Sequence, residues 1–159
     1  VSASGTAVAT PDEAAIQTGV SSEAKTAREA LAANSRAMNE VIEKLKASGI
    51  DPKDIQTSQF SIDPVHTYPK EGHPPVVAGY RAHNSVTVKV RNLDTLGEVL
   101  DQLVAAGSNE LGGISFGVSK AETLKDEARK QAIANALRRA KLYAAAAGAE
   151  VGEIVQISE

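Results

Sequence analysis

The clearest pattern in the sequence is an alternation of apolar and polar residues between residues 76 and 90. A period of two is typical of a β-strand with one face against the core and the other toward solvent or a partner. The apolar face carries Val76, Ala78, Tyr80, Ala82, Val86, Val88 and Val90. The polar face carries Arg81, His83, Ser85, Thr87 and Lys89. The segment therefore predicts a half-buried strand of an antiparallel sheet.

Three other segments show the helical period instead. Apolar residues recur at three- and four-residue steps from residue 27 to residue 45, after the capping-box sequence Thr26-Ala27-Arg28-Glu29. A second helix is expected between Asn92 and Gly107, and a third from residue 119 to about residue 147. A glycine follows each of the three segments, and glycine is the usual residue just past a helix C-terminus.

Shorter β-prone segments surround these helices. They are residues 1–8, 14–20, 55–65, 111–118 and 151–157. Turn-forming residues at 10–12 predict a hairpin between the first two, and the Pro-rich residues 69–75 predict a loop before the strand at 76–90. The resulting order is ββαββαβαβ. It predicts an α+β domain over residues 1–159, with three helices and one mainly antiparallel sheet.

Composition favours a compact fold with an aliphatic core. Hydrophobic residues make up 42% of the 159 residues but aromatic residues only 3%, so Val, Ile, Leu and Ala must fill the interior. Each buried CH₂ contributes about 0.8 kcal/mol, so alanine-rich faces stabilise weakly. We therefore expect the protein to gain stability by burying further surface against copies of itself.

Charge and cysteine content exclude several classes of function. The net charge of −3 gives no general attraction to nucleic acid or to anionic membranes. The absence of cysteine excludes disulfides, thiol nucleophiles and cysteine-based zinc sites. No segment approaches the about 20 apolar residues of a transmembrane helix. The chain begins at Val1 rather than Met, which favours loss of an N-terminal piece, either a cleaved secretory signal or a shortened sequence.

The three histidines are candidate metal ligands. His66, His73 and His83 all fall on the hairpin expected from residues 55 to 90. They lack a tight ligand spacing such as His-x-x-x-His, and His66 and His83 lie at different distances from the loop. We interpret them as surface histidines, with a weak metal site as the alternative, and predict no cofactor.

No catalytic constellation is recognised in the sequence. Residues 113–117 match the letters of the hydrolase elbow Gly-x-Ser-x-Gly, but Ser115 alternates with Ile114 and Phe116 inside an expected strand. Gly112 and Gly113 lack the residues that complete a phosphate-binding loop, and they indicate a bulge or a close backbone approach. The sequence therefore predicts a protein that is not an enzyme.

The third helix carries a stripe of alanines at every fourth residue. These are Ala128, Ala132, Ala136, Ala140 and Ala144. Small side chains allow another backbone to approach closely, either the protein's own sheet or the helix of another protomer. Under the second interpretation Ala132, Ala136 and Ala140 are oligomer contacts. Arg81 and His83 on the polar strand face are the other expected contacts.

Short motifs run through the chain in a specific order. They are Gly5 with Pro11-Asp12, residues 24–30 (AKTAREA) with Asn34 and Met38, Gly49-Ile50, residues 54–57 (DIQT), Gly79-Tyr80, residues 88–91 (VKVR), Gly113-Ile114, residues 127–129 (EAR), residues 145–148 (AAAG) and residues 157–159 (ISE). Their order and spacing resemble the SIMPL-domain family (DUF541). This group contains the periplasmic immunogenic proteins and oxidative-stress defence proteins of Gram-negative bacteria.

The resemblance implies an exported protein, periplasmic or associated with the outer membrane, that assembles into large ring- or channel-like homo-oligomers. It also implies links to envelope stress and antigenicity, with no established enzyme activity. Family chains usually continue past residues 157–159 through a Pro- and Met-rich loop to a final strand. The resemblance therefore implies a domain that lacks this loop and strand and has an open sheet edge.

Two functional hypotheses follow from the sequence. The first is a non-enzymatic envelope protein that self-assembles through the hairpin at residues 55–90 and the helix at residues 119–147. The alternative is a monomer or small oligomer that binds a ligand or peptide with the loop at residues 66–75 and an open sheet edge. A saturable thermal shift with an envelope ligand would favour the alternative.

Overall fold

The structure is a computed structural model that describes residues 1–68 and 74–159, and it comprises two compact units. Pro11–Gly117 form the sheet unit, and Val1–Thr10 with Val118–Glu159 form the helix unit. The elements are β1 (Glu13–Ala24), α1 (Ala27–Ala47), β2 (Ile55–Thr67), β3 (Val76–Val90), α2 (Leu96–Ala105), β4 (Glu110–Gly117) and α3 (Ala121–Ala146). The predicted α+β class, with three helices and an antiparallel sheet, is confirmed. The predicted loop residues 69–73, with His73, lie outside the described residues.

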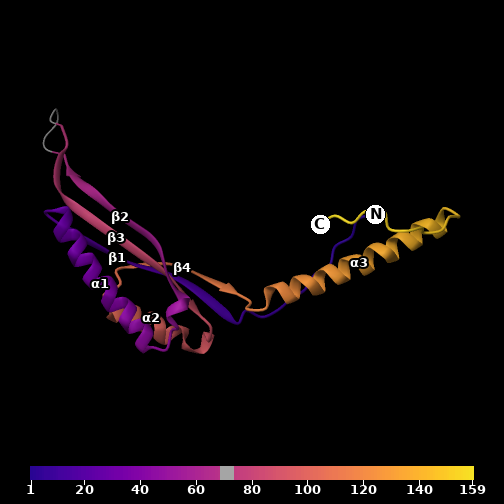
Figure 1. The fold of residues 1–159 in the computed structure, drawn as a ribbon, viewed down its shortest axis with the longest axis horizontal. Helices are drawn as coiled ribbons and strands as arrows, with labels where there is room; N and C mark the ends of the chain where they lie inside the picture. The colour runs from indigo at the N-terminus through magenta and orange to yellow at the C-terminus, as the bar shows by residue number, and fades with distance from the viewer. Residues whose placement is uncertain (69–73) are drawn as a thin grey trace. The chain divides into compact units, whose positions relative to one another are not determined.

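The sheet has the strand order β2-β3-β1-β4, and every neighbouring pair is antiparallel (Figure 1). β1 and β3 form its centre, with Ile16 opposite Val88 and Thr18 opposite Val86. Side chains alternate between the two faces of a strand, so these residues share one face. They are buried under α1, which packs along both central strands. We call this face the helix side and the opposite one the open face.

The amphipathic strand predicted at residues 76–90 matches β3 at both ends. From Ala82 to Val90 its apolar residues are buried on the helix side, as predicted. Before Gly79 the prediction is wrong, because Val76 is 54% exposed and Ala78 is exposed as well. Pairing with β1 ends where Tyr80 meets Ala24, so this outer part of β3 pairs with β2 alone and has no buried face.

Helix α1 begins and ends where the sequence predicts. The Thr26 hydroxyl accepts a hydrogen bond from the Glu29 amide, and the Glu29 carboxylate accepts one from the Thr26 amide, so the capping box is formed. After the helix, Gly49 has a φ of 85°, which favours glycine at this position. The buried face differs from the prediction at its start, because Leu31 is 38% exposed and Asn34 is fully buried.

Asn34 occupies a core position because its amide group joins α1 to both central strands. Its Nδ2 donates to the carbonyl oxygens of Val20 (2.7 Å) and Ala82 (3.0 Å). Val20 lies on β1 and Ala82 on β3, so one side chain fixes the helix across the strand pair. A buried polar group is stabilising only when it is bonded in this way.

One end of the β2–β3 pair is closed by an ion pair. The Arg91 guanidinium donates to both carboxylate oxygens of Asp54, at 2.6 and 2.7 Å. Asp54 is only 8% exposed, and its hydrogen bonds with Arg91 hold the pKa of its carboxyl below its ordinary value. Two parallel bonds of this kind fix geometry as well as charge.

The helix unit consists of α3 and the extended segment formed by residues 1–8. Ala3, Gly5 and Ala7 are half-buried, whereas the residues between them are exposed, so the small side chains face α3. A Cβ on Gly5 would lie 1.9 Å from the carbonyl oxygen of Ala128 and 2.7 Å from the amide nitrogen of Ala132. The alanine stripe therefore does allow a close backbone approach, and the approaching backbone is the chain's own N-terminal segment.

Side chains of α3 also bond to the backbone of this segment. Gln131 Oε1 accepts from the Thr6 amide (3.3 Å), Asn135 Nδ2 donates to the Ser4 carbonyl (3.0 Å) and an Arg139 Nη donates to the Ser2 carbonyl (3.0 Å). The three helix residues are four positions apart and the three segment residues two apart. Four helical residues rise about 6.0 Å and two strand residues about 6.6 Å, so the two repeats nearly match.

These three bonds, which we call the ladder, explain why residues 1–8 form no β-strand, contrary to the prediction. The segment is extended, but the backbone groups on one of its edges bond to helix side chains rather than to a neighbouring strand. Residues 151–157 also form no strand, because their backbone groups have no hydrogen bond to any described residue. At the chain end, the Glu159 carboxylate accepts from Arg129 Nε at 3.0 Å.

Candidate functional site

The open face of the sheet unit carries a row of paired polar side chains. Arg81, His83 and Lys89 project from β3 on this face, as the alternation predicts. Arg81 Nε donates to Glu23 at 2.7 Å, and Lys89 Nζ donates to Glu13 at 3.0 Å. Both pairs join β3 to β1, and cross-strand pairs of opposite charge stabilise a sheet modestly.

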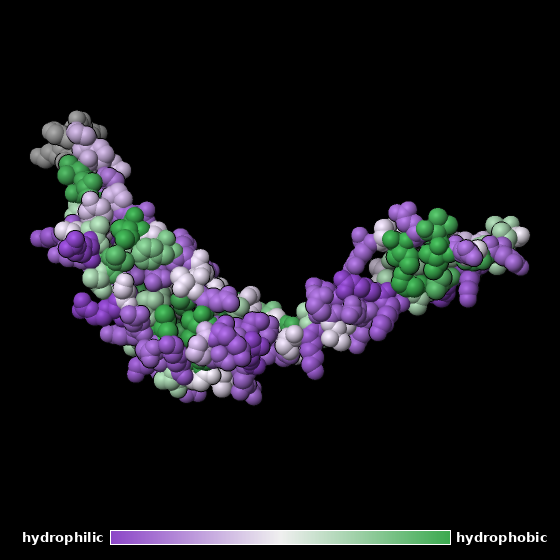
Figure 2. Space-filling view, in the orientation of Figure 1, coloured by the Kyte–Doolittle hydropathy of each residue, from purple (hydrophilic) through white to green (hydrophobic). Residues whose placement is uncertain are grey.

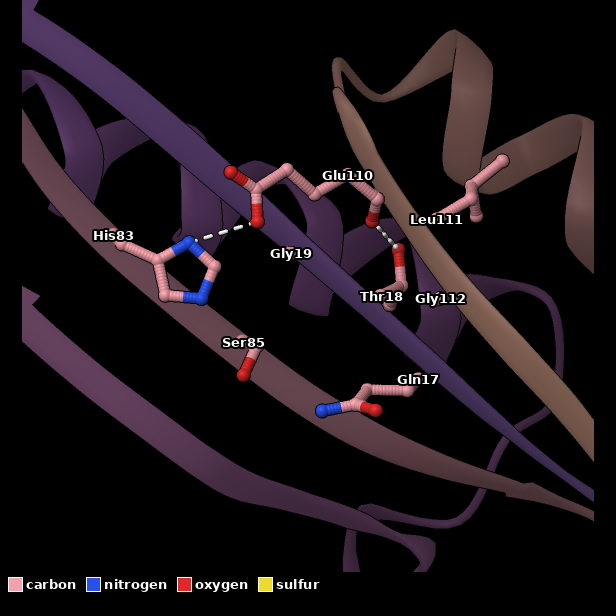
Figure 3. Close-up of a pocket in the computed structure, with 8 residues that line it drawn as sticks. All are labelled: Gln17, Thr18, Gly19, His83, Ser85, Glu110, Leu111 and Gly112. Carbon is pink, nitrogen blue, oxygen red and sulfur yellow. Dashed lines mark hydrogen bonds and ion pairs between the residues drawn. The ribbon is translucent and has the colours of Figure 1, made fainter.

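His83 forms an ion pair that spans the width of a whole strand. Its Nδ1 lies 2.8 Å from Oε2 of Glu110, although His83 is on β3 and Glu110 on β4, with β1 between them. Strands in a sheet lie about 4.8 Å apart, so the two backbones are separated by about twice that distance. Figure 3 shows the imidazole and the carboxylate meeting above the backbone of β1.

Gly19 makes this contact accessible. It lies directly opposite Glu110 on β4 and Ser85 on β3, so a side chain here would project between them on the open face. A Cβ at Gly19 would come within 2.9 Å of the Asn84 carbonyl oxygen and 3.2 Å of Ser85 Cβ. The missing side chain leaves a shallow depression of about 230 Å³. Its lining includes Gln17, Ser85 and Gly112 beside the His83–Glu110 pair (Figure 3).

A bulge in β4 forms the other wall of the depression. The register of β1 and β4 shifts between Ile16 and Thr18, opposite the Gly112-Gly113 pair. A Cβ on Gly112 would lie 3.1 Å from Gln17 Cβ, so the backbones approach closely there. The predicted bulge at this glycine pair is therefore confirmed. Ser115 lies within β4, so its predicted place inside a strand is confirmed as well.

The beginning of β4 is fixed by short polar side chains of β1 and the preceding loop. The Thr18 and Ser108 hydroxyls lie 2.6 Å apart, and Ser108 Oγ also donates to the Gly19 carbonyl at 3.0 Å. Next to them, the Asn109 side chain exchanges two hydrogen bonds with the Ser21 backbone, each 2.8 Å long. The same two hydroxyls lie 3.3 Å from the Glu110 carbonyl oxygen, so they fix the backbone from which the Glu110 side chain reaches His83.

The chemistry available in the depression is limited to hydrogen bonding and charge. Nδ1 of His83 must carry a hydrogen to bond to Glu110, so Nε2 is the nitrogen left to meet a ligand. A serine hydrolase would need a nucleophile bonded to that nitrogen. Ser85 is the nearest hydroxyl along the strand, and it bonds instead to the Ser58 hydroxyl at 3.0 Å. The arrangement therefore resembles part of a catalytic triad without the nucleophile.

Metal ligation is not supported by the arrangement of ligand-type side chains. Among the described residues, no group of three or more His, Cys, Asp or Glu side chains is close enough to share a metal ion. His66 pairs with Val77 and His83 with Ser61 across the hairpin, so the two histidines do not face each other. His73 is not among the described residues.

The five residues predicted as contacts divide between the two units. Arg81 and His83 share the open face of β3, where Arg81 is paired with a carboxylate of the neighbouring strand β1 and His83 with one of β4, on the far side of β1. Ala132, Ala136 and Ala140 lie on the half-buried stripe of α3, and the backbone at Ala132 contacts Gly5. The sequence analysis missed Glu110 as the partner of His83. Gly19, an isolated glycine inside a strand pattern, was the signal that two backbones or side chains meet there.

Across residues 1–68 and 74–159, none of the helices has the length and apolar character needed to cross a membrane.

A family model and several known proteins are similar to this chain along most or all of its length. The SIMPL family model, described as a protein of unknown function (DUF541), matches residues 1–159. The chain is 40% identical over 162 residues to the 26 kDa periplasmic immunogenic protein of Brucella melitensis, covering all of this chain and 65% of that protein. It is 35% identical over 149 residues to the uncharacterized protein YggE of Edwardsiella ictaluri, covering 94% of this chain and 62% of that protein.

The YggE protein of Escherichia coli K12 is 33% identical over 149 residues, with 94% of this chain and 60% of that protein covered. The chain thus spans less than two thirds of the length of each of these relatives. Because the family model matches along the whole chain, the protein belongs to the SIMPL family.

Proposed function

We propose that this protein is a non-enzymatic component of the cell envelope that works by self-association into a larger assembly. The observation that carries the proposal is the apolar surface at the edges of the sheet unit. Phe60 on β2 and Phe116 on β4 are 51% and 59% exposed, although their register places them on the helix side. Leu111 and Ile114 of β4 are exposed beside Phe116. Contiguous exposed apolar side chains typically mark an interaction surface.

The β4 edge is the stronger candidate for the contact. Edge strands that avoid pairing usually carry proline, charge or bulges. β2 has these features: Pro64, Asp63 and two register shifts along its pairing with β3. β4 has one bulge, at Gly112-Gly113, but it has no proline and no lysine, and its one charged residue is Glu110 at its start. An antiparallel β4–β4 contact would bring Leu111, Ile114 and Phe116 of two copies together on one side of a continuous sheet.

The envelope location is proposed from the relatives. The Brucella proteins are named periplasmic and immunogenic, and we extend the periplasmic location to this chain. A ring- or channel-like form, association with the outer membrane, and a role in envelope or oxidative stress are proposed with it on the family resemblance alone. The proposal of a non-enzyme is supported by the Ser85 hydroxyl, which bonds to Ser58 and not to His83, so the described residues of the depression offer His83 no bonded nucleophile.

The test is the solution mass of the protein, measured by light scattering after size exclusion. We expect a discrete oligomer for the wild type and a smaller species for Phe116→Ser. Leu31→Ser is the matched control, because Leu31 is a single exposed apolar residue on α1. It should keep the wild-type mass. A wild-type monomer at micromolar concentration would refute self-association, and an unchanged mass for Phe116→Ser would exclude the β4 edge.

A ligand-binding module is the second candidate function, supported by the depression beside the His83–Glu110 pair. Arg81 and His83, together with Ala132, Ala136 and Ala140, stay proposed oligomer contacts. Under the alternative, His83 would bind a small polar ligand instead, with the loop at residues 66–75 nearby in the sequence. A saturable thermal shift that His83→Ala abolishes would favour the alternative.

A further inference from the structure

The N-terminal segment has one bonded edge and one open edge. In an extended strand both backbone groups of a residue point to the same side, and the side alternates from residue to residue. The groups of Ser2, Ser4 and Thr6 that bond to α3 therefore define one edge. Ala3 and Gly5 direct their amide and carbonyl groups to the other edge, as does Ala7. Within the part of the chain that the structure describes, none of these groups has a hydrogen-bond partner.

The apolar flank of α3 lies on the same side as this open edge. Gln131 and Asn135, which bond to the segment, precede Ala132 and Ala136 by one residue, whereas Ile133 and Leu137 follow these alanines by one residue. One helical step is about 100°, so the two sets lie on opposite sides of the alanine stripe. Ile133 and Leu137 are each 39% exposed. A strand added along the open edge would cover both of them.

Residues 151–157 have the properties of such a strand. Val151, Val155 and Ile157 fall on one face together with Glu153, and the three apolar residues are exposed, with Val155 at 98%. Their backbone groups are unbonded within the described residues. Figure 2 shows apolar surface gathered over the second half of α3 and the residues that follow it. One chain thus contains both a segment able to add as a strand (residues 151–157) and an edge able to accept it (residues 1–8). Neither is paired within the described residues.

We infer that residues 151–157 of a second copy add as a strand to the open edge of residues 1–8 and cover Ile133 and Leu137. The chain's own tail leaves this edge unoccupied. The tail end pairs with its own α3 through Glu159 and Arg129, and the exchange requires release of this solvent-exposed pair, which contributes little stability. Reciprocal exchange satisfies both edges of a symmetric pair and buries both apolar flanks. The inference rests on the proposed self-association and names one of its contact surfaces.

Two proline variants test the edge by analytical ultracentrifugation. Ala7→Pro removes an amide of the open edge and keeps the three bonds to α3. Val8→Pro is the matched control, because the Val8 amide points to the edge that bonds to α3 and itself bonds to no described residue. We expect Ala7→Pro to raise the dissociation constant of the assembly at least about tenfold, and Val8→Pro to leave it unchanged.

Cross-linking identifies the donor strand. The chain has no cysteine, so single variants Ser4→Cys and Gln156→Cys can be mixed and treated with a short bis-maleimide. The expected product is a heterodimer of the two variants. Cross-linked homodimers of Ser4→Cys would mean that two N-terminal segments pair with each other. In a double variant that carries both Ser4→Cys and Gln156→Cys, cross-links formed only within one chain would mean that the chain's own tail docks on the edge. Either result overturns the inference.

The proposed function and this inference fail differently. If the wild type associates and both proline variants match it, the inference is wrong and self-association stands. If the wild type is a monomer, both are wrong.

Discussion

Gly5→Ala tests the packing of the N-terminal segment on α3. The new Cβ would lie 1.9 Å from the Ala128 carbonyl oxygen, so the segment must move by about 1.3 Å to reach an ordinary contact. The three ladder bonds are 3.0 to 3.3 Å long, and this shift would carry them beyond hydrogen-bond range. Each bond contributes about 0.5–1.5 kcal/mol, so loss of all three should lower the free energy that docks the segment by about 1.5–4.5 kcal/mol, with a central value near 3 kcal/mol.

The assay is native-state hydrogen exchange of the Thr6 amide, which is protected only while the segment is docked on Gln131. A loss of this size corresponds to exchange that is faster on the order of 100-fold. Gly97→Ala is the control, because Gly97 lies in α2 with no atom within 4 Å of the new Cβ. It should raise stability by up to about 1 kcal/mol. Unchanged Thr6 exchange in Gly5→Ala would refute the close packing of Gly5 on the stripe.

Three further predictions concern the sheet unit. Asp54→Asn should lower the free energy of unfolding at pH 7 by about 1–3 kcal/mol, as measured by urea denaturation. Because Arg91 lowers the pKa of Asp54, this stabilisation is complete at neutral pH and is lost as the pH falls through the lowered pKa; a wild-type advantage that persists in strong acid would contradict it. Asn34→Leu should lower the free energy of unfolding by about 1–3 kcal/mol, since the Val20 and Ala82 carbonyls lose their hydrogen-bond donor. A melting temperature equal to that of the wild type would show that these carbonyls find another donor. Val88→Asp should cost at least about 3 kcal/mol and Thr87→Asp, on the open face, much less; similar melting temperatures would mean that the faces are misassigned.

The parts of the fold that follow from local pattern were predictable from the sequence. The period of two in β3 and the capping box of α1 are properties of neighbouring residues, so they require no knowledge of the rest of the chain. The outer part of β3 was mispredicted because burial depends on what lies above a face, and Val76 has no helix above it. Asn34 was missed because a polar residue on a core face is recognised only from its distant bonding partners.

The candidate site was only half predictable for the same reason. The alternation placed His83 on the polar face, but its partner Glu110 lies 27 positions later on a strand that is not its neighbour in the sheet. Their contact depends on the strand order and on Gly19, and neither appears in the local pattern around His83. The alanine stripe likewise predicted a close backbone approach, but the sequence left that backbone open between the protein's own sheet and another protomer. In the structure the backbone at Gly5 lies against the stripe, and the contact between protomers stays a proposal.

The ladder between α3 and the N-terminal segment joins two repeats of slightly different length. Its two repeats differ by about 0.6 Å per step, so the error accumulates and each added rung fits less well. The next rung would join Glu127 to the Val8 amide, and no such bond exists between these two described residues. A helix can therefore hold an extended chain in register for only a few rungs before the chain must leave it. The mismatch accounts for the end of the ladder at Thr6, although the sequence keeps its β-character to residue 8.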